Sequence, residues 1–451
     1  MARGDGGRNG FKGLGGGLGG SLGGAIGGRG AMVAAVDLGA SKVGCFIMKA
    51  DGARASDRSI HVAGVAHMRS RGVRGGSIIN VEETAEALAA AVERAEAMAD
   101  VKVSGVVLTT SGGQLSSCRL PATVSLGPRP VDENDLQRAI QYALAGARFP
   151  GRRPIHLMPI SWSVDGQAGV KDPRGLFGRQ LHVELLAATI SEAAFATYRH
   201  CVESVYLNLE GVVAAPFAAG LAVLEEDEME LGAVCIDMGG GSTSAAVFAG
   251  GSLVHVDSLA VGGQHVTQDI ARGLSTTMAG AERIKTLHGS AIASSGEDRE
   301  MIEAPPRGDD PAAGPVVAPR SLLKGVIAPR VEETLELMRE RLKAADAPLP
   351  PGAGVVLTGG ASELAGVREV AVRIFDRPVR LGRPRRAPHL AEAASGPAFA
   401  AAAGALQRAA FGPREVVSSK ALAASAKAER APVDPNANAI VKVASWLRAN
   451  L

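Results

Sequence analysis

The chain is poor in several residue types and motifs, and each shortage narrows what it can be. Aromatic residues make up only 3% of its 451 residues, so a hydrophobic core must consist mainly of Ala, Val and Leu. The 4 cysteines lie far apart, with no CxxC pair or Cys/His cluster, which argues against a zinc site and fits a reducing compartment. No GxxxxGK motif occurs, which excludes a P-loop NTPase.

Net charge and hydropathy argue against further classes of protein. The net charge of +2 at pH 7 argues against wholesale binding of nucleic acid. No apolar run approaches the roughly 18 residues of a transmembrane helix. Residues 1–30 are a Gly-rich, low-complexity stretch, and we expect a flexible tail there rather than a signal peptide.

Two segments in different halves of the chain share one pattern. Residues 33–48 read VAAVDLGASKVGCFIM, and residues 234–248 read VCIDMGGGSTSAAVF. Each predicts an apolar strand, an Asp, a Gly-rich turn with a hydroxyl residue, and a second apolar strand. Backbone N–H groups that converge in such turns can bind phosphate. The predicted nucleotide-binding residues are Asp37, Gly39, Ala40, Ser41 and Lys42 in the first acidic loop (residues 37–42), and Asp237, Gly239, Gly240, Gly241, Ser242 and Thr243 in the second (residues 237–243).

The two aspartates suggest a metal as well as a nucleotide. At the ends of strands that face each other across a cleft, Asp37 and Asp237 could hold Mg²⁺ through its water shell, because Mg²⁺ prefers oxygen ligands. Lys42 would either neutralise phosphate charge or point outward. A single such hairpin is more often an ordinary Gly-rich turn, but two in the same arrangement favour a phosphate clamp.

Two further motifs could bind the nucleoside. VLTGGASEL predicts a strand, a Gly turn and a helix start, with Gly359, Gly360 and Ala361 lying against ribose or base. In AERIKTLHG, Glu282 and Lys285 share one helix face and could bracket the ribose. The alternatives are a plain strand-to-helix turn and a surface ion pair.

These motifs, in this order, resemble the bacterial actin-like cell-division family FtsA. The resemblance rests on DLGASK, EEDEMELGAVCIDMGGGST, AGAERIKTLHG and VVLTGGASELAGV, and it covers roughly residues 31–411 plus the terminal segment. It implies an α/β, duplicated actin-like (ribonuclease-H-like) fold, with two lobes around a nucleotide cleft and an inserted small α/β subdomain. The implied cofactors are ATP and Mg²⁺.

One departure from related ATPases bears on catalysis. Many actin-like ATPases place a Glu or Gln before a Pro in the helix after the insert, where it orients the attacking water. Here that stretch reads EGVVAAPFAAG, so Ala215 precedes Pro216, and Glu210 stands earlier in the chain. We therefore expect at most a weak ATPase, and no catalytic residue is assigned.

The expected organisation combines these motifs with composition. Apolar spacing predicts helices over residues 82–98, 132–147 and 331–345. The expected parts are the tail (1–30), a first lobe (31–112 with 196–230 and 390–411), an inserted subdomain (113–195), a second lobe (231–389), a flexible linker (412–438) and an amphipathic helix (439–451).

The terminal segment reads AIVKVASWLRANL, which on a helical wheel is amphipathic and too short to span a bilayer. Its predicted membrane-facing residues are Ile440, Val443, Trp446, Leu447 and Leu451. Such a helix suits the membrane interface, and the alternative is a helix docked on the protein's own core. FtsA-like proteins end in a membrane-targeting helix of this kind.

The resemblance implies a peripheral protein on the cytoplasmic face of the inner membrane, at the septum of the division site. Its implied partners are FtsZ, a second copy in a head-to-tail polymer to which the insert contributes, membrane lipids and later division proteins. Arg330, at the expected start of the 331–345 helix, could pair with an acidic FtsZ tail or be an ordinary flanking charge. The alternatives are an actin-like scaffold ATPase of a pilus or secretion system, and an actin-fold sugar kinase.

Overall fold

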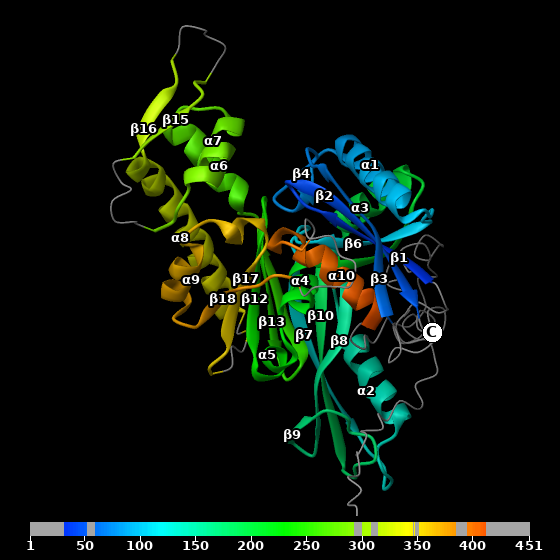
Figure 1. Ribbon diagram of the computed structural model, residues 1–451. Coiled ribbons are helices and arrows are strands. Elements are labelled where there is room, and N and C mark those ends of the chain that lie inside the picture. The colour runs from blue at the N-terminus through cyan, green and yellow to red at the C-terminus, as the bar shows by residue number, and fades with distance from the viewer. Residues whose placement is uncertain are drawn as a thin grey trace, which may run out of the picture.

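The structure is a computed structural model that describes residues 31–51, 59–292, 300–307, 314–345, 347, 351–384 and 395–411. The predicted tail, linker and terminal helix therefore lie outside the described residues. Two lobes and a projecting insert make up the described part (Figure 1). In it, no helix is long and apolar enough to cross a membrane.

The first lobe is built on a five-stranded sheet. Its strand order is β11-β6-β1-β2-β3, with β1 antiparallel to β2 and parallel to β6. The strands are β1 (Ala31–Leu38), β2 (Lys42–Asp51), β3 (Ser59–Arg69), β6 (Gly105–Thr110) and β11 (Asn208–Ala214). Helices packed on this sheet are α1 (Val81–Ala99), α3 (Glu192–Ser204), α4 (Ala215–Val223) and α10 (Ala400–Phe411), the last preceded by the short η5 (Pro397–Phe399).

The second lobe repeats this arrangement. Its sheet runs β18-β17-β12-β13-β14, and β12 is antiparallel to β13 and parallel to β17, as β1 is to β2 and β6. The strands are β12 (Ala233–Met238), β13 (Thr243–Ala249), β14 (Ser252–Leu259), β17 (Gly354–Thr358) and β18 (Val379–Leu381). The predicted duplicated fold is thus confirmed, and it puts both acidic loops at the same strand-to-strand turn of their sheets.

The helices of the second lobe lie together on the left of Figure 1. They are α6 (Gly263–Gly273), α7 (Met278–His288), α8 (Arg320–Ala344) and α9 (Val367–Phe375), next to the hairpin β15 (Met301–Ala304) and β16 (Val316–Pro319). Short elements elsewhere are β4 (Val73–Arg74), β5 (Ser77–Ile78), α5 (Glu226–Leu231) and η3 (Gly360–Glu363).

The predicted insert is a small α/β subdomain that extends the second sheet. Its strands continue the order from β14 as β7-β10-β8-β9, and the pair Asp257–Ser116 joins β14 to β7. Helix α2 (Glu133–Gly146) packs on β7 (Ser116–Ser125) and β10 (Gln180–Ser191), beside β8 (Arg152–Val164) and β9 (Gln167–Val170). Buried Trp162, Leu181 and Ala139 belong to a hydrophobic cluster confined to this part. The domain limits given above stay predictions.

Two local predictions were wrong. The 331–345 helix begins at Arg320, because Pro329 lies inside it and buried Leu323 and Ile327 continue the apolar face across the proline. A proline usually ends a helix through its missing N–H and its clash with the preceding turn, but here the helix continues through Pro329. The expected helix start after Gly360 is instead the single-turn η3, since α9 begins only at Val367.

Candidate functional site

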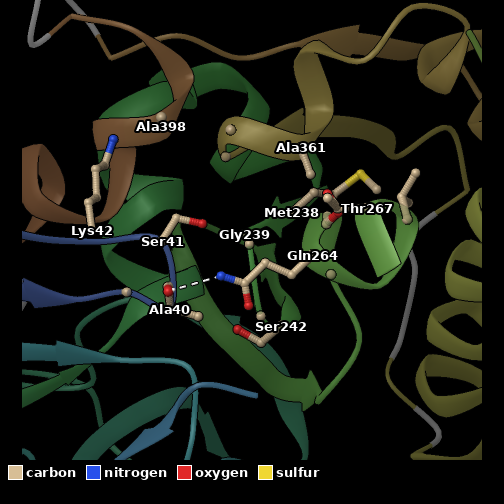
Figure 2. A pocket seen from close by; sticks show the side chains of 18 of the residues that line it. Ala40, Ser41, Lys42, Met238, Gly239, Ser242, Gln264, Thr267, Ala361 and Ala398 are labelled. Carbon is tan, nitrogen blue, oxygen red and sulfur yellow. Dashed lines mark hydrogen bonds between the residues drawn. The ribbon is translucent and has the colours of Figure 1, made fainter. Parts of the chain in front are cut away.

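A cavity of about 1420 Å³ lies between the two lobes, and every residue predicted to bind nucleotide lines it. Both acidic loops, the Gly359–Ala361 turn and the Glu282 and Lys285 side chains therefore meet in one place. The cavity is also lined by residues that sequence reasoning did not single out, among them Ser111, and Gln264 and Ala398 (Figure 2).

The two acidic loops begin with carboxylates at equivalent strand ends. Asp37 pairs with Thr109 in the register of β1 and β6, and Thr109 donates a hydrogen bond of 2.6 Å to Asp37 Oδ1. Asp237 occupies the same place in β12, opposite Thr358 of β17. Burial and the neighbouring Asp37 raise the pKa of Asp237 to about 7, while Lys42 acts in the opposite direction. Burial also raises the pKa of Asp37, against the hydrogen bond from Thr109 and the charge of Lys42.

Glycines allow the loops to approach closely. A Cβ added to Gly240 would lie 2.1 Å from Ser41 Oγ, so the two acidic loops are in contact across the cavity. Gly359 has φ +84°, and a Cβ there would lie 2.3 Å from Asp237 Oδ1. At Gly359 only glycine fits without displacing the Asp237 carboxylate or the Met238 backbone, whereas a Cβ at Gly240 would require the Ser41 side chain to move.

Lys42 lies in the cavity wall and packs against an aromatic ring. Its amine lies 3.3 Å from the centroid of the Phe399 ring, and in Figure 2 it points toward the segment that carries Ala398. Burial lowers the pKa of Lys42, whereas the charges of Asp37, Asp237 and Glu363 raise it. A cation over an aromatic face is attracted by the ring quadrupole, so Phe399 and these carboxylates together hold the amine.

Glu282 and Lys285, which were predicted to bracket the ribose, form an ion pair in the cavity wall. Lys285 Nζ lies 2.7 Å from Glu282 Oε2, so the two side chains form the ion pair that was the alternative interpretation of this motif. Lys285 also donates to Thr267 Oγ1 at 2.9 Å and to the Gly263 carbonyl at 3.2 Å. The pair thus connects α7 to the start of α6, where the cavity wall is formed.

Residues that sequence reasoning missed join the lobes. Gln264 Nε2 donates to the carbonyl of Ala40 at 3.0 Å, from α6 of the second lobe to the first acidic loop (Figure 2). Ser111 Oγ, just after β6, lies 2.7 Å from Ser242 Oγ. The only local signal for Gln264 is the Gly pair before it, which does not by itself indicate a partner across a cleft.

The structure places the remaining predicted residues as follows. Ala215 lines the cavity, so a methyl group stands where a water-positioning carboxylate was sought. Glu210 lies at the other end of β11, beside Gly105, and does not line the cavity. Arg330 Nε donates to Asp269 of α6 at 2.6 Å, and the guanidinium also pairs with Glu333. The predicted membrane-facing residues lie outside the described residues.

Comparisons with known proteins agree on one family. The family model for the cell division protein FtsA matches residues 234–404, and the model for the SHS2 domain inserted in FtsA matches residues 112–189. The chain is 41% identical to the cell division protein FtsA of Rhizobium meliloti (strain 1021), over 83% of this chain and 86% of that protein. It is 31% identical to the protein of the same name from Escherichia coli (strain K12), over 83% and 89%.

Solved structures share the fold at low sequence identity. The PilM-PilN type IV pilus biogenesis complex matches with a TM-score of 0.56 and 18% identity, covering 84% of this chain and 98% of that one. MreB5 of Spiroplasma citri bound to ADP matches with a TM-score of 0.50 and 14% identity, covering 84% and 95%. Both likenesses support the actin-like fold alone.

Proposed function

The chain belongs to the FtsA family of cell division proteins, and on that premise we propose that it binds ATP with Mg²⁺ between its lobes and tethers FtsZ filaments to the membrane. The observation that carries the nucleotide proposal is the convergence of all predicted binding residues on one cavity. MreB5, which shares the fold, has been solved with ADP, and this supports a nucleotide in the same place.

The residues present fit a magnesium ion. Two carboxylates, Asp37 and Asp237, lie near the ends of equivalent strands, burial raises the pKa of both, and the charge of Asp37 raises that of Asp237 further. A divalent cation would favour both charged forms, and carboxylate and water oxygens are its preferred ligands. When bound, it would neutralise part of the phosphate charge.

The chain's own residues would position the nucleotide rather than hydrolyse it quickly. Gly240 and Gly359 let backbone approach the phosphates and the nucleoside, and Lys285 is already oriented by Thr267. Since Ala215 offers no group to orient water, turnover would be weak. ATP would mainly hold the lobes together and order the contacts of a head-to-tail polymer, with the insert contributing.

The membrane and partner proposals rest on sequence. The terminal segment (439–451) would lie in the membrane interface on the cytoplasmic face at the division site, and polymerisation would strengthen its attachment by avidity. Arg330 would bind the acidic FtsZ tail in competition with Asp269, its present partner. Later division proteins would join the same assembly.

Liposome co-sedimentation with and without ATP tests the tether. The full chain should pellet with liposomes, and a chain ending near Arg430 should not. Leu447→Glu, on the apolar stripe, should abolish pelleting, whereas Ser445→Glu, on the opposite side of the wheel, should not. Equal pelleting of the full and shortened chains would contradict the proposal. Recruitment of FtsZ to these liposomes separates the division function from a pilus scaffold, which shares the fold.

A further inference from the structure

A short cationic segment forms part of the cavity wall beside the acidic loops. It begins at the last residue of β3, and its arginines Arg69, Arg71 and Arg74 all line the cavity. All three residues are exposed, and none of their guanidinium groups has an ion pair or hydrogen bond to the described residues. By contrast, the amines of Lys42 and Lys285 are already held by protein groups.

The same segment contains a buried hydroxyl without a partner. Ser70 is 8% exposed and lines the cavity, and its Oγ has no hydrogen bond. A buried polar group that lacks a partner costs free energy unless a ligand or water supplies one. The backbone N–H of Ser70 donates to the Ser41 carbonyl at 3.1 Å, which fixes the residue against the first acidic loop.

The turn that follows lies against the second acidic loop. A Cβ added to Gly241 would lie 3.0 Å from the backbone N of Gly75. Gly76 has φ +77° and packs on Gly112, just after Ser111. Residues 69–76 thus touch both acidic loops at once, and a phosphate held between those loops would face this segment.

We propose that residues 69–74 form an anion subsite for the terminal phosphate of the bound nucleotide, built from Ser70 Oγ and the arginine guanidinium groups. This inference rests on the proposed nucleotide binding and adds to it a preference for the triphosphate over the diphosphate. Guanidinium groups match phosphate oxygens in geometry and charge, and a hydroxyl can donate one further bond. A diphosphate lacks the group that reaches this segment, so the subsite makes the protein prefer ATP over ADP.

Equilibrium binding of ATP and ADP to the full chain, both with Mg²⁺, tests the subsite. Ser70→Ala and the double change Arg71→Ala, Arg74→Ala should each weaken ATP binding about tenfold and change ADP binding less than about twofold. Arg94→Ala removes an exposed charge from α1, away from the cavity, and should leave both affinities unchanged. Inorganic phosphate alone should compete only weakly, because it lacks the contacts of the nucleoside side.

The outcomes distinguish failure of the phosphate subsite from failure of the proposed nucleotide binding. If the unmodified chain binds neither nucleotide, the proposed function fails. If it binds nucleotide but the variants lose ATP and ADP equally, or lose neither, the subsite is wrong. Thermal unfolding without nucleotide checks the fold: losing an unpartnered hydroxyl should leave the melting temperature of Ser70→Ala unchanged or slightly higher. A variant that melts early is replaced by Ser70→Gly or by Arg71→Gln, for which the same selective loss of ATP is expected.

Discussion

Replacing Asp237 by Asn should stabilise the nucleotide-free protein at high pH while it abolishes ATP binding. The pKa of Asp237 is about 7 in the folded chain, against about 3.9 for an Asp in an unfolded chain. Between these values the folded chain keeps a proton that the unfolded chain has released. The stabilisation is therefore complete below about pH 4 and is lost as the pH rises through about 7.

The size of the effect follows from proton linkage. Each pH unit within this window lowers the free energy of unfolding by up to about 1.4 kcal/mol, which amounts to roughly 2.5 kcal/mol between about pH 5 and about pH 8. Asn cannot ionise, so the variant loses this dependence. Asp37, whose pKa is also raised, contributes in the same direction in both proteins.

Urea unfolding at a series of pH values, with EDTA and without nucleotide, measures the difference directly. The advantage of Asp237→Asn over the unmodified chain should grow by roughly 2.5 kcal/mol from about pH 5 to about pH 8. Asp227→Asn, at an exposed position on α5, serves as the control and should keep the original dependence. Parallel curves for the chain and the Asp237 variant would refute the reasoning.

Two further predictions concern Gly359 at the cavity and Arg330 of α8. Gly359→Ala should weaken ATP binding at least about tenfold and destabilise the fold by about 2 kcal/mol, because the new Cβ would lie 2.3 Å from a carboxylate oxygen of Asp237. Gly352→Ala has a similar φ of +83° with nothing within 4 Å, so it isolates the backbone strain; equal ATP affinities in the two variants would refute the steric argument. The double change Asp269→Ala, Glu333→Ala should free Arg330 from both of its carboxylate partners and tighten binding of an acidic FtsZ tail peptide a few-fold in fluorescence anisotropy, and unchanged binding would exclude Arg330 from that contact.

The fold, and the meeting of both acidic loops at one cavity, could be predicted from the sequence because both depend on local pattern. An apolar strand, an Asp and a Gly-rich turn occur twice, and the duplication implies that the two turns face each other. Gln264 and Ser70 could not be predicted in this way, since the contact of Gln264 with Ala40 and the burial of Ser70 without a partner both result from tertiary packing. The predicted start of α8 fell after Pro329, although apolar residues on its N-terminal side continue the buried face of the helix.

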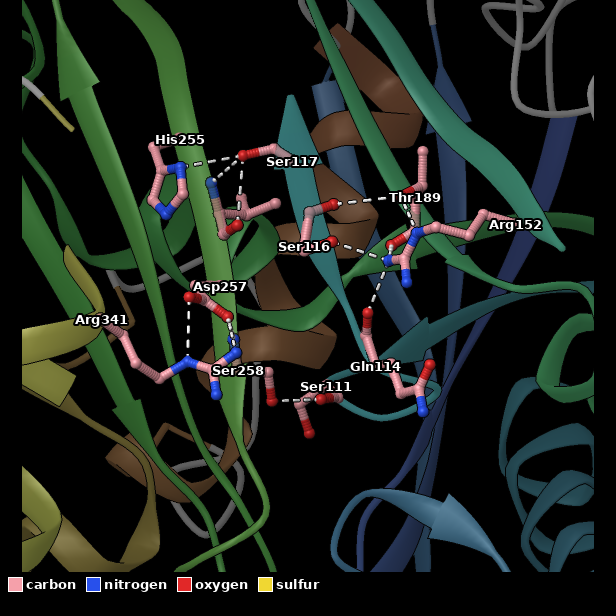
Figure 3. Close-up of polar contacts among 11 residues, drawn as sticks. Ser111, Gln114, Ser116, Ser117, Arg152, Thr189, His255, Asp257, Ser258 and Arg341 are labelled. Carbon is pink, nitrogen blue, oxygen red and sulfur yellow. Dashed lines mark hydrogen bonds and ion pairs between the residues drawn. The ribbon is translucent and has the colours of Figure 1, made fainter. Parts of the chain in front are cut away.

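A line of polar contacts connects the second acidic loop to α8 past the root of the insert, and Figure 3 shows its part from Ser111 to Arg341. Ser242 Oγ lies 2.7 Å from Ser111 Oγ, and the hydroxyl of Ser258 donates to the Ser111 carbonyl. The Ser258 N–H in turn donates to Asp257 Oδ1 at 2.7 Å. Arg341 of α8 donates to both Asp257 oxygens, at 2.9 and 3.0 Å. Since Ser111 belongs to the first lobe and Asp257 pairs with the first strand of the insert, this line touches all three parts of the molecule.

Arg341→Ala should therefore change more than the charge on the surface of α8. The Asp257 side chain is only 9% exposed and would lose its cation, which should lower the free energy of unfolding by about 2 kcal/mol. Lys343→Ala removes a neighbouring, mostly exposed charge from α8 and should cost little. If the line transmits the position of the second acidic loop, Arg341→Ala should also reduce the rise in melting temperature that ATP produces, beyond any change in Lys343→Ala. An equal ATP-induced rise in both variants would mean that Asp257 and Arg341 only stabilise the junction, and that α8 does not respond to the nucleotide through them.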